Sequence, residues 1–246
     1  MPQDIRDQTG AIAGDVFMID KVLLEEQYQK ASPKKSPIRA KVGSVESLML
    51  LSQSIQQGSR LEMTSISALS LEGMDISELE VLKCRLFNCA FQQCDLTGSI
   101  FEDAVFVNCD LSNAIIESVG FRRCEFVNCK FTGASFAGSI FENVYLNECT
   151  ISLASLTHMR WKSVSVTASD LIKSDMGEME LSQVSFAGCC LTGANFFKTR
   201  LLGIDLTTCQ IDGIVISDSM TEVCGAKMGI YQAVSFARKL GILVEE

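Results

Sequence analysis

A repeat of five residues dominates this sequence. Large apolar side chains recur at every fifth position, without an insertion or deletion, from Leu86 to Ile216, and the same phase extends back to Leu61. Neither the period of a helix nor that of a strand produces this spacing. Self-similarity at one fixed period is typical of solenoid proteins, whose units bury a shared core by stacking.

A second periodic position lies two residues before each large one and mostly holds a small side chain. Residues two apart in an extended segment share a face, so each unit points one small and one large side chain inward. Two positions after the large residue Gly or Asn is frequent, as at Asn88, Gly98 and Asn108. Both residue types tolerate a positive φ, so each unit is predicted to be a short extended side followed by a corner.

The small position also indicates how many units close one turn. Cysteines there are separated by multiples of 20 residues, at Cys89, Cys109, Cys129, Cys149, Cys189 and Cys209. Four units in each coil explain this spacing, because each cysteine then stacks on the cysteine of the same side in the next coil. Residues 61–216 would make roughly eight coils at a spacing of ~4.8 Å. Met159, Met179 and Ile204 are large for the small position, so we expect the middle and last coils to bulge.

The units resemble the pentapeptide-repeat family, whose motif is a small residue, then often Asn or Asp, a central Leu or Phe, and two freer positions. Residues 94–98 (Cys-Asp-Leu-Thr-Gly), 109–113 (Cys-Asp-Leu-Ser-Asn) and 194–196 (Ala-Asn-Phe) show the motif closely. The resemblance covers about two-thirds of the chain. It implies a right-handed quadrilateral β-helix, here an all-β solenoid over residues 61–218.

The rest of the chain divides into three parts. We expect residues 1–40 to be a helical or flexible leader that ends in a basic Pro/Ser-rich linker. Residues 41–60 should form an N-terminal helix that covers the first coil, whose backbone edge is otherwise open. Residues 219–246 should form a C-terminal capping helix and a tail.

The C-terminal helix is expected over Ile230 to Leu240, where the sequence is amphipathic and Gly241 supplies a stop. The helix should cap the last coil. The resemblance to Qnr-type members also implies end-to-end pairing of two chains through this helix, with Tyr231, Phe236 and Leu240 at the cap or interface. Capping alone and capping with dimerisation both stay open at this point.

Little in the sequence points to catalysis. The only histidine, His158, falls at an outward turn position, where an isolated imidazole defines no catalytic constellation. The cysteine ladder lacks the paired spacing of zinc sites, and a buried thiol has the right volume for the small position. We therefore predict no catalytic residue, no bound metal and no cofactor, and a protein that is not an enzyme.

The charge of the chain points to a protein partner. A net charge of −9 disfavours direct binding to nucleic acid. One predicted face is acidic and is opposed only by Lys198; its members are Asp75, Glu78, Asp95, Glu117, Asp175, Glu178 and Asp218. The resemblance to topoisomerase-binding members implies that such a rod imitates duplex DNA for gyrase or topoisomerase IV and protects against quinolones. A solvated surface that only aids solubility is the alternative.

Other features favour different functions. Outward apolar residues such as Ile100, Ile140 and Phe197 favour a scaffold or adaptor. A leader over residues 1–40 would suit a secreted effector. Against export, the N-terminus lacks a cationic start followed by an apolar run, and we expect reduced thiols in the cytoplasm and no membrane span. The sequence therefore predicts a non-enzymatic protein that binds other proteins, with type II topoisomerase as the leading named partner.

Overall fold

The structure is a computed structural model that describes residues 60–245. All described residues belong to one compact unit. The predicted leader, and all of the predicted N-terminal capping helix except Arg60, lie outside the described residues. Within residues 60–245, no helix has both the length and the apolar character needed to cross a membrane.

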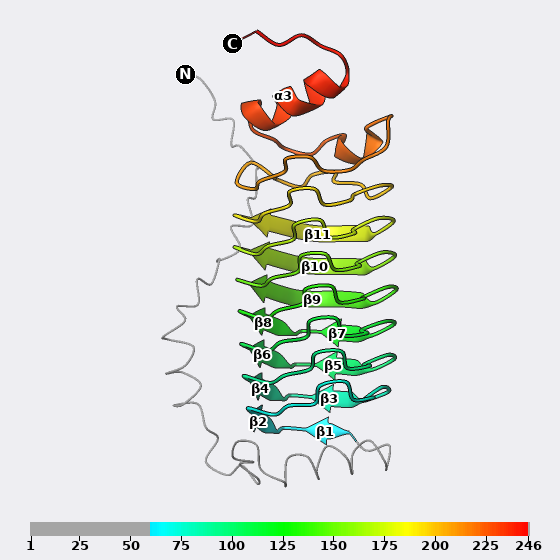
Figure 1. Cartoon of the computed structure of the whole chain (residues 1–246), viewed down its shortest axis with the longest axis vertical. Helices are drawn as coiled ribbons and strands as arrows, with labels where there is room; N and C mark the ends of the chain where they lie inside the picture. Colours follow the sequence, from blue (N-terminus) through cyan, green and yellow to red (C-terminus); the bar gives the residue numbers. More distant parts are fainter. Residues whose placement is uncertain (1–59, 246) are drawn as a thin grey trace, which may run out of the picture. The chain divides into compact units, whose positions relative to one another are not determined.

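The repeat forms a parallel β-solenoid in which each strand pairs with the strand 20 residues further along the chain (Figure 1). One side is built from β1 (Leu61–Glu62), β3 (Glu80–Leu82), β5 (Ile100–Glu102) and β7 (Gly120–Arg122). The next side is built from β2 (Ser65–Ser67), β4 (Arg85–Phe87), β6 (Val105–Val107) and β8 (Glu125–Val127). Both sides continue as single longer strands in β9 (Ile140–Asn147), β10 (Arg160–Thr167) and β11 (Glu180–Ala187).

Corners recur every five residues, as the sequence predicts. Their residues have positive φ, for example 51° at Asn88 and 70° at Gly98, and four corners fall in each 20-residue step. Between corners, the small and large periodic side chains are buried inside the coil. Aromatic rings stack within it, with ring centroids 4.9 Å apart between Phe101 and Phe121 and 5.7 Å apart between Phe141 and Trp161. This interior is predominantly apolar, so the charged groups of the described residues lie mainly on the outer faces.

The solenoid has fewer turns of paired strands than the eight coils expected. Paired strands span about six turns, from Leu61 to Leu181, because β11 pairs only with β10. Beyond β11 the step of 20 continues through isolated bridges such as that between Asn195 and Val215. Asp205 then pairs with Lys227, a step of 22 residues, so the strict repeat ends in the last turn.

The expected bulge is wrong for the middle of the solenoid. Met159 is fully buried and the adjoining strand β10 stays paired along its length. Near the end, Met179 and Ile204 lie on either side of the break in pairing above β11, where Leu181 and Val184 are only half-buried. The solenoid therefore accommodates the large side chain of Met159 without loss of strand pairing. Met179 and Ile204, in contrast, lie where the pairing of strands ends.

The C-terminal helix is confirmed. Helix α3 (Ile230–Lys239) follows the short 3₁₀-helix η1 (Thr221–Val223), and its chain reverses at Gly241, whose φ is +79°. Figure 1 shows α3 lying across the end of the solenoid. The helix is the terminal element of the described chain.

Candidate protein-binding faces

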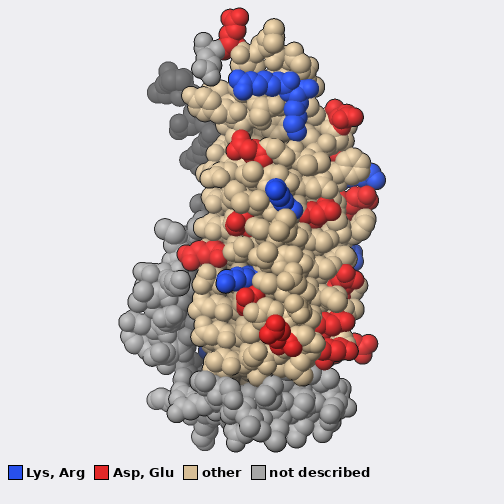
Figure 2. Space-filling model, viewed as in Figure 1, with Lys and Arg blue, Asp and Glu red and all other residues tan. Residues whose placement is uncertain are grey.

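The sequence-predicted acidic residues lie along one side of the solenoid, which we call the acidic face: Asp75, Glu78, Asp95, Glu117, Asp175, Glu178 and Asp218. The 20-residue step produces this arrangement, because Asp75 bridges to Asp95 and the same column continues through Ile115, Ser135 and Ser155 to Asp175. Figure 2 shows acidic side chains gathered along one edge of the molecule.

Three aspartates of the acidic face hold its turns together. Asp75 accepts hydrogen bonds from the Ser77 hydroxyl (2.7 Å) and backbone N–H (3.0 Å), and these bonds lower the pKa of its carboxyl group. Asp95 accepts from the backbone N–H of Thr97 at 2.9 Å. Side chains that bond the backbone two residues on are the usual way for Asp to stabilise a turn. These carboxylates are therefore structural groups as well as surface charges.

Asp175 is tied in more firmly than the other two aspartates. Its Oδ1 accepts from the backbone N–H of Gly177 (3.1 Å) and from the side-chain amide of Asn195 in the next turn (2.8 Å). Asn195 repeats the pattern by accepting from the N–H of Phe197 at 2.9 Å. The Asp or Asn at this motif position therefore stabilises its own turn, and this role requires no partner protein.

The glutamates of the acidic face are freer to meet a partner. Glu78 and Glu178 are exposed at positive-φ corners, and Glu117 accepts from the Ser135 hydroxyl at 2.6 Å. Glu178 accepts from Lys198 at 3.2 Å, and His158 lies 4.0 Å away on an exposed side chain. These three glutamates and the exposed Asp218 are the carboxylates of this face that the turns do not need for their hydrogen bonds.

The acidic face is not continuous. Between Glu117 and Asp175 the corresponding column holds Ser135 and Ser155, and the adjoining outward positions are uncharged. At a strand spacing of ~4.8 Å, the turns that carry Glu117 and Asp175 are roughly 14 Å apart, because the turns of Ser135 and Ser155 lie between them. A cationic partner would therefore meet two clusters of negative charge.

A second charged surface of the solenoid carries both acidic and basic residues. It lies on β5, β7, β9 and β10 and on the corners that follow β5 and β7, and we call it the charge-paired face: Glu102, Asp103, Arg122, Arg123, Glu142 and Lys162. Arg123 donates to Asp103 at 2.6 Å and also to Glu102, which lowers the pKa of Asp103. Lys162 (3.0 Å) and Arg122 (3.2 Å) both donate to Glu142 and lower its pKa, with Lys162 the stronger influence.

The C-terminal helix caps the solenoid through polar as well as apolar contacts. The Gln232 side-chain amide donates to the backbone carbonyls of Leu206 (2.8 Å) and Cys209 (2.7 Å), and Lys239 donates to that of Ile214 (3.1 Å). Phe236 is half-buried against the core. These bonds satisfy carbonyl groups at the end of the coil that have no further strand to pair with.

The other two predicted cap or interface residues do not contribute to the cap. Tyr231 is 92% exposed and Leu240 is 64% exposed, and Ile230, Ile242 and Leu243 are exposed beside them in the sequence. The structure thus separates Phe236, a capping residue, from Tyr231 and Leu240, which face solvent. An apolar end of this kind is the feature on which an interface between copies would depend.

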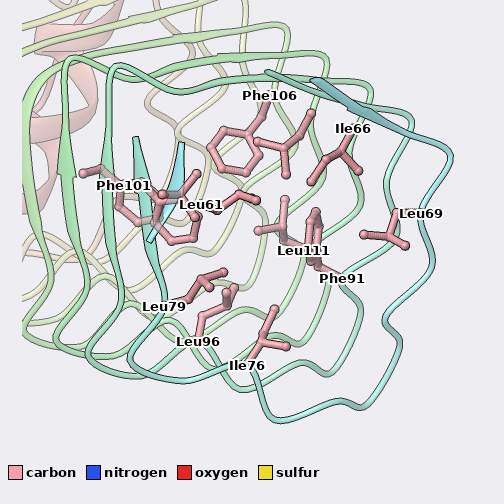
Figure 3. Close-up of a pocket in the computed structure, with 13 residues that line it drawn as sticks. Leu61, Ile66, Leu69, Ile76, Leu79, Phe91, Leu96, Phe101, Phe106 and Leu111 are labelled. Atoms are coloured by element: carbon pink, nitrogen blue, oxygen red, sulfur yellow. The ribbon is translucent and has the colours of Figure 1, made fainter. Parts of the chain in front are cut away.

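Within residues 60–245, the interior has no room for a small molecule. Figure 3 shows a hollow in the first turns that is lined only by apolar side chains, including Leu61, Ile66 and Phe91, and its volume is about 20 Å³. Cys124 and Cys149 are typical of the buried cysteines, because burial raises the pKa of each thiol to about 12. Within residues 60–245, no three His, Cys, Asp or Glu side chains are placed to hold a metal ion.

Models of known protein families match the part of the chain that forms this ladder. A pentapeptide repeat region matches residues 99–176, and an eight-copy pentapeptide repeat model matches residues 164–209. These segments are the in-register turns described above. Residues 99–209 of the chain are pentapeptide repeats.

Several solved structures are similar to this pentapeptide repeat protein. QnrB1, a plasmid-mediated fluoroquinolone resistance protein, is 21% identical, with a TM-score of 0.40, over 77% of this chain and 92% of that one. HetL, involved in heterocyst differentiation in the cyanobacterium Nostoc, is 15% identical, with a TM-score of 0.22, over 75% and 94%. A protein of the Arabidopsis thaliana thylakoid lumen is 17% identical, with a TM-score of 0.23, over 50% and 68%.

No curated protein sequence matches this chain. At the identities found among the solved structures, a shared activity does not follow from the shared repeat.

The sequence places the residues of the charge-paired face on one side of the solenoid, and the structure adds which of them are paired. The step of 20 residues places Arg122 beside Glu142 and Arg123 beside Asp103, so complementary charges could have been matched across coils. The motif itself could likewise have identified Asp75, Asp95 and Asp175 as turn-forming residues, because each directly follows its unit's small position.

Proposed function

We propose that this pentapeptide repeat protein is a non-enzymatic protein that places its acidic face in the cationic groove of a DNA-binding protein. The observation that carries the proposal is the alignment on one side of the ladder of carboxylates that do not cap a turn, above all Glu78, Glu117 and Glu178. Complementary charge steers a basic partner to such a surface and fixes its orientation. Type II topoisomerase, gyrase or topoisomerase IV, is the named partner that we propose, in agreement with the family resemblance.

The magnitude of the charge restricts what the acidic face imitates. From Asp75 to Asp218 the face carries seven carboxylates over about 34 Å at ~4.8 Å per turn. Duplex DNA presents a charge every ~1.7 Å, so it would carry about twenty over that length. We propose that the protein imitates the shape of DNA and two local clusters of its charge. Fluoroquinolone protection would then follow from competition for the same groove.

A supercoiling assay tests the proposal. The full chain, added at micromolar concentration to DNA gyrase with and without a fluoroquinolone, should reduce supercoiling or relieve the drug's inhibition. The double variant Glu117→Lys, Glu178→Lys should lose this effect. The matched control is Glu72→Lys, Asp212→Lys, which makes the same change in net charge at two exposed acids on another side. An effect that survives the first variant, or is lost equally in the control, contradicts a role for the acidic face.

A scaffold or adaptor is the second candidate, favoured by exposed apolar side chains along the solenoid. Ile100 is 50% exposed, Leu202 is 64% exposed and Phe197 is 41% exposed.

We also propose that two chains pair through the exposed apolar end around Tyr231 and Leu240, that the solenoid winds with a right-handed sense, and that the protein acts in the cytoplasm. A monomer in light scattering at all concentrations tested would contradict the pairing.

A further inference from the structure

A notch in the surface lies on the strands that border the acidic face. Ile100 on β5, Gly120 on β7 and Ile140 on β9 are consecutive partners in one outward column. The two isoleucine side chains are 50% and 39% exposed, and Gly120 places no side chain between them. Adjacent strands are ~4.8 Å apart, so the isoleucines stand roughly 10 Å apart, which leaves the width of one aliphatic side chain.

The fold does not explain why residue 120 is glycine. Along the solenoid, other described glycines such as Gly98 and Gly138 sit at corners with φ near +70°, where a side chain is strained. Gly177 lacks a positive φ, but a Cβ there would come within 3.1 Å of Asp175. At Gly120 neither constraint applies: φ is not positive and a Cβ would meet nothing within 4 Å. Glycine inside a strand often marks a place where another molecule approaches closely.

The surroundings of the notch indicate what kind of group approaches. The corner residues two positions before the members of this column are Gly98, Ser118 and Gly138. Because these residues have a small side chain or none, the notch is open toward the acidic face. Glu80 lies next to Ile100 in the same column and is exposed, and Glu117 is on the adjoining side of the same turn as Gly120. The notch therefore has carboxylates toward the acidic face and Arg122, paired with Glu142, on its other side. An apolar slot with free acidic groups on one border matches an apolar side chain carried among basic residues.

The column continues into a larger hollow. Ile140 also lines a surface depression of about 450 Å³ over β9, β10 and β11, whose charged lining residues are Glu142, Arg160, Lys162 and Glu180. The notch and the depression therefore form one track along the solenoid, with Ile140 as their shared wall. A loop of a partner that lies along this track can place one side chain at Gly120 and the following residues over the depression.

We propose that the notch at Gly120 is the apolar anchor point of the partner interface. Its occupant is an aliphatic or aromatic side chain on a basic loop of the partner, and the inference rests on the proposed function, since the acidic face brings that loop to the notch. Buried apolar anchors surrounded by weaker polar contacts are the usual source of affinity in protein interfaces. Charge then directs the encounter, and the notch determines how long the complex lasts.

The test is the affinity of the full-length chain for DNA gyrase, measured by biolayer interferometry. Gly120→Ile fills the notch on a strand that accepts the side chain, and it should raise Kd at least about tenfold, mainly through faster dissociation. Ser185→Ile, an exposed outward position of strand β11, is the matched control and should bind as the unaltered chain does. The double variant Ile100→Ser, Ile140→Ser removes the walls of the notch instead and should also weaken binding.

The outcomes separate the two proposals. If Gly120→Ile binds gyrase as tightly as the unaltered chain while Glu117→Lys, Glu178→Lys binds weakly, the notch proposal is overturned and the acidic face stands. If the unaltered chain does not bind gyrase, both proposals are overturned. Equal weakening by Gly120→Ile and Ser185→Ile would assign the loss to general disturbance of the solenoid and would also overturn the notch.

Discussion

The acidic face and the charge-paired face are built on the same ladder but use their charges differently. On the charge-paired face, the 20-residue step sets Arg122 beside Glu142 and Arg123 beside Asp103, so the charges are satisfied within the protein. On the acidic face the same step sets Asp75 beside Asp95, and like charges on neighbouring strands repel each other. Two surfaces rich in carboxylates therefore offer a partner very different amounts of unpaired charge.

This difference shows that the number of acidic residues is a poor guide to a binding surface. Exposed ion pairs contribute little to stability, and their main effect is to neutralise each other. Within the acidic face a further division appears, because Asp175 is engaged in turn hydrogen bonds while Glu178 reaches solvent beside it. The comparison assigns stability to one carboxylate and recognition to its neighbour three residues away.

The largest effect on stability is expected at the turn-forming aspartates. Asp175→Ala removes the acceptor for the N–H of Gly177 and for the amide of Asn195, and should lower the free energy of unfolding by about 1–2 kcal/mol. Glu178→Ala should change it by less than about 0.5 kcal/mol, as is usual at exposed positions. Urea unfolding followed by circular dichroism measures both. Equal losses in the two variants would abolish the distinction between structural and free carboxylates.

A smaller effect of opposite sign is expected at the border between the two faces. Gly120→Val should raise the free energy of unfolding by about 0.5–1 kcal/mol, because valine favours a strand and loses less backbone freedom than glycine. The same urea titration measures the gain. A loss of stability would mean that the fold requires glycine at this position, which would remove the argument for the notch.

Acidification should affect the charge-paired face, though modestly. The pKa values of Asp103 and Glu142 are lowered in the folded state by Arg123 and Lys162, so both carboxylates contribute stability at neutral pH. This contribution is complete above their unfolded pKa values and is lost as the pH falls below about 4 toward the folded ones. The melting temperature should therefore fall on acidification, and it should fall less steeply in Glu142→Gln. Identical slopes would show that these ion pairs contribute nothing to stability.

Much of the fold was predictable from the sequence because each unit repeats the same local physics. The buried side chains, the positive-φ corners and the step of 20 residues follow from the spacing of large, small and Gly or Asn residues. The end of the repeat was harder to predict from the sequence. The change to a 22-residue step between Asp205 and Lys227 depends on how the chain passes through η1 before α3.

The candidate site was only partly predictable from the sequence. Periodicity placed the acidic residues on one side, but it treated all carboxylates as equivalent. Whether a carboxylate is free depends on bonds to neighbours in the same turn or the next, such as Asn195 for Asp175 and Lys198 for Glu178. The opening at Gly120 likewise required knowledge of its φ and of the empty space around it.

The rate at which the chain associates with DNA gyrase, measured as ionic strength is raised from about 50 to about 500 mM, tests the role of the acidic face most directly. At low salt, Glu117→Lys, Glu178→Lys should associate about tenfold more slowly than the unaltered chain, and its rate should depend less on salt. Glu72→Lys, Asp212→Lys should follow the unaltered chain throughout. Equal slowing of both variants would show that net charge, rather than the placement of free carboxylates on one face, governs binding.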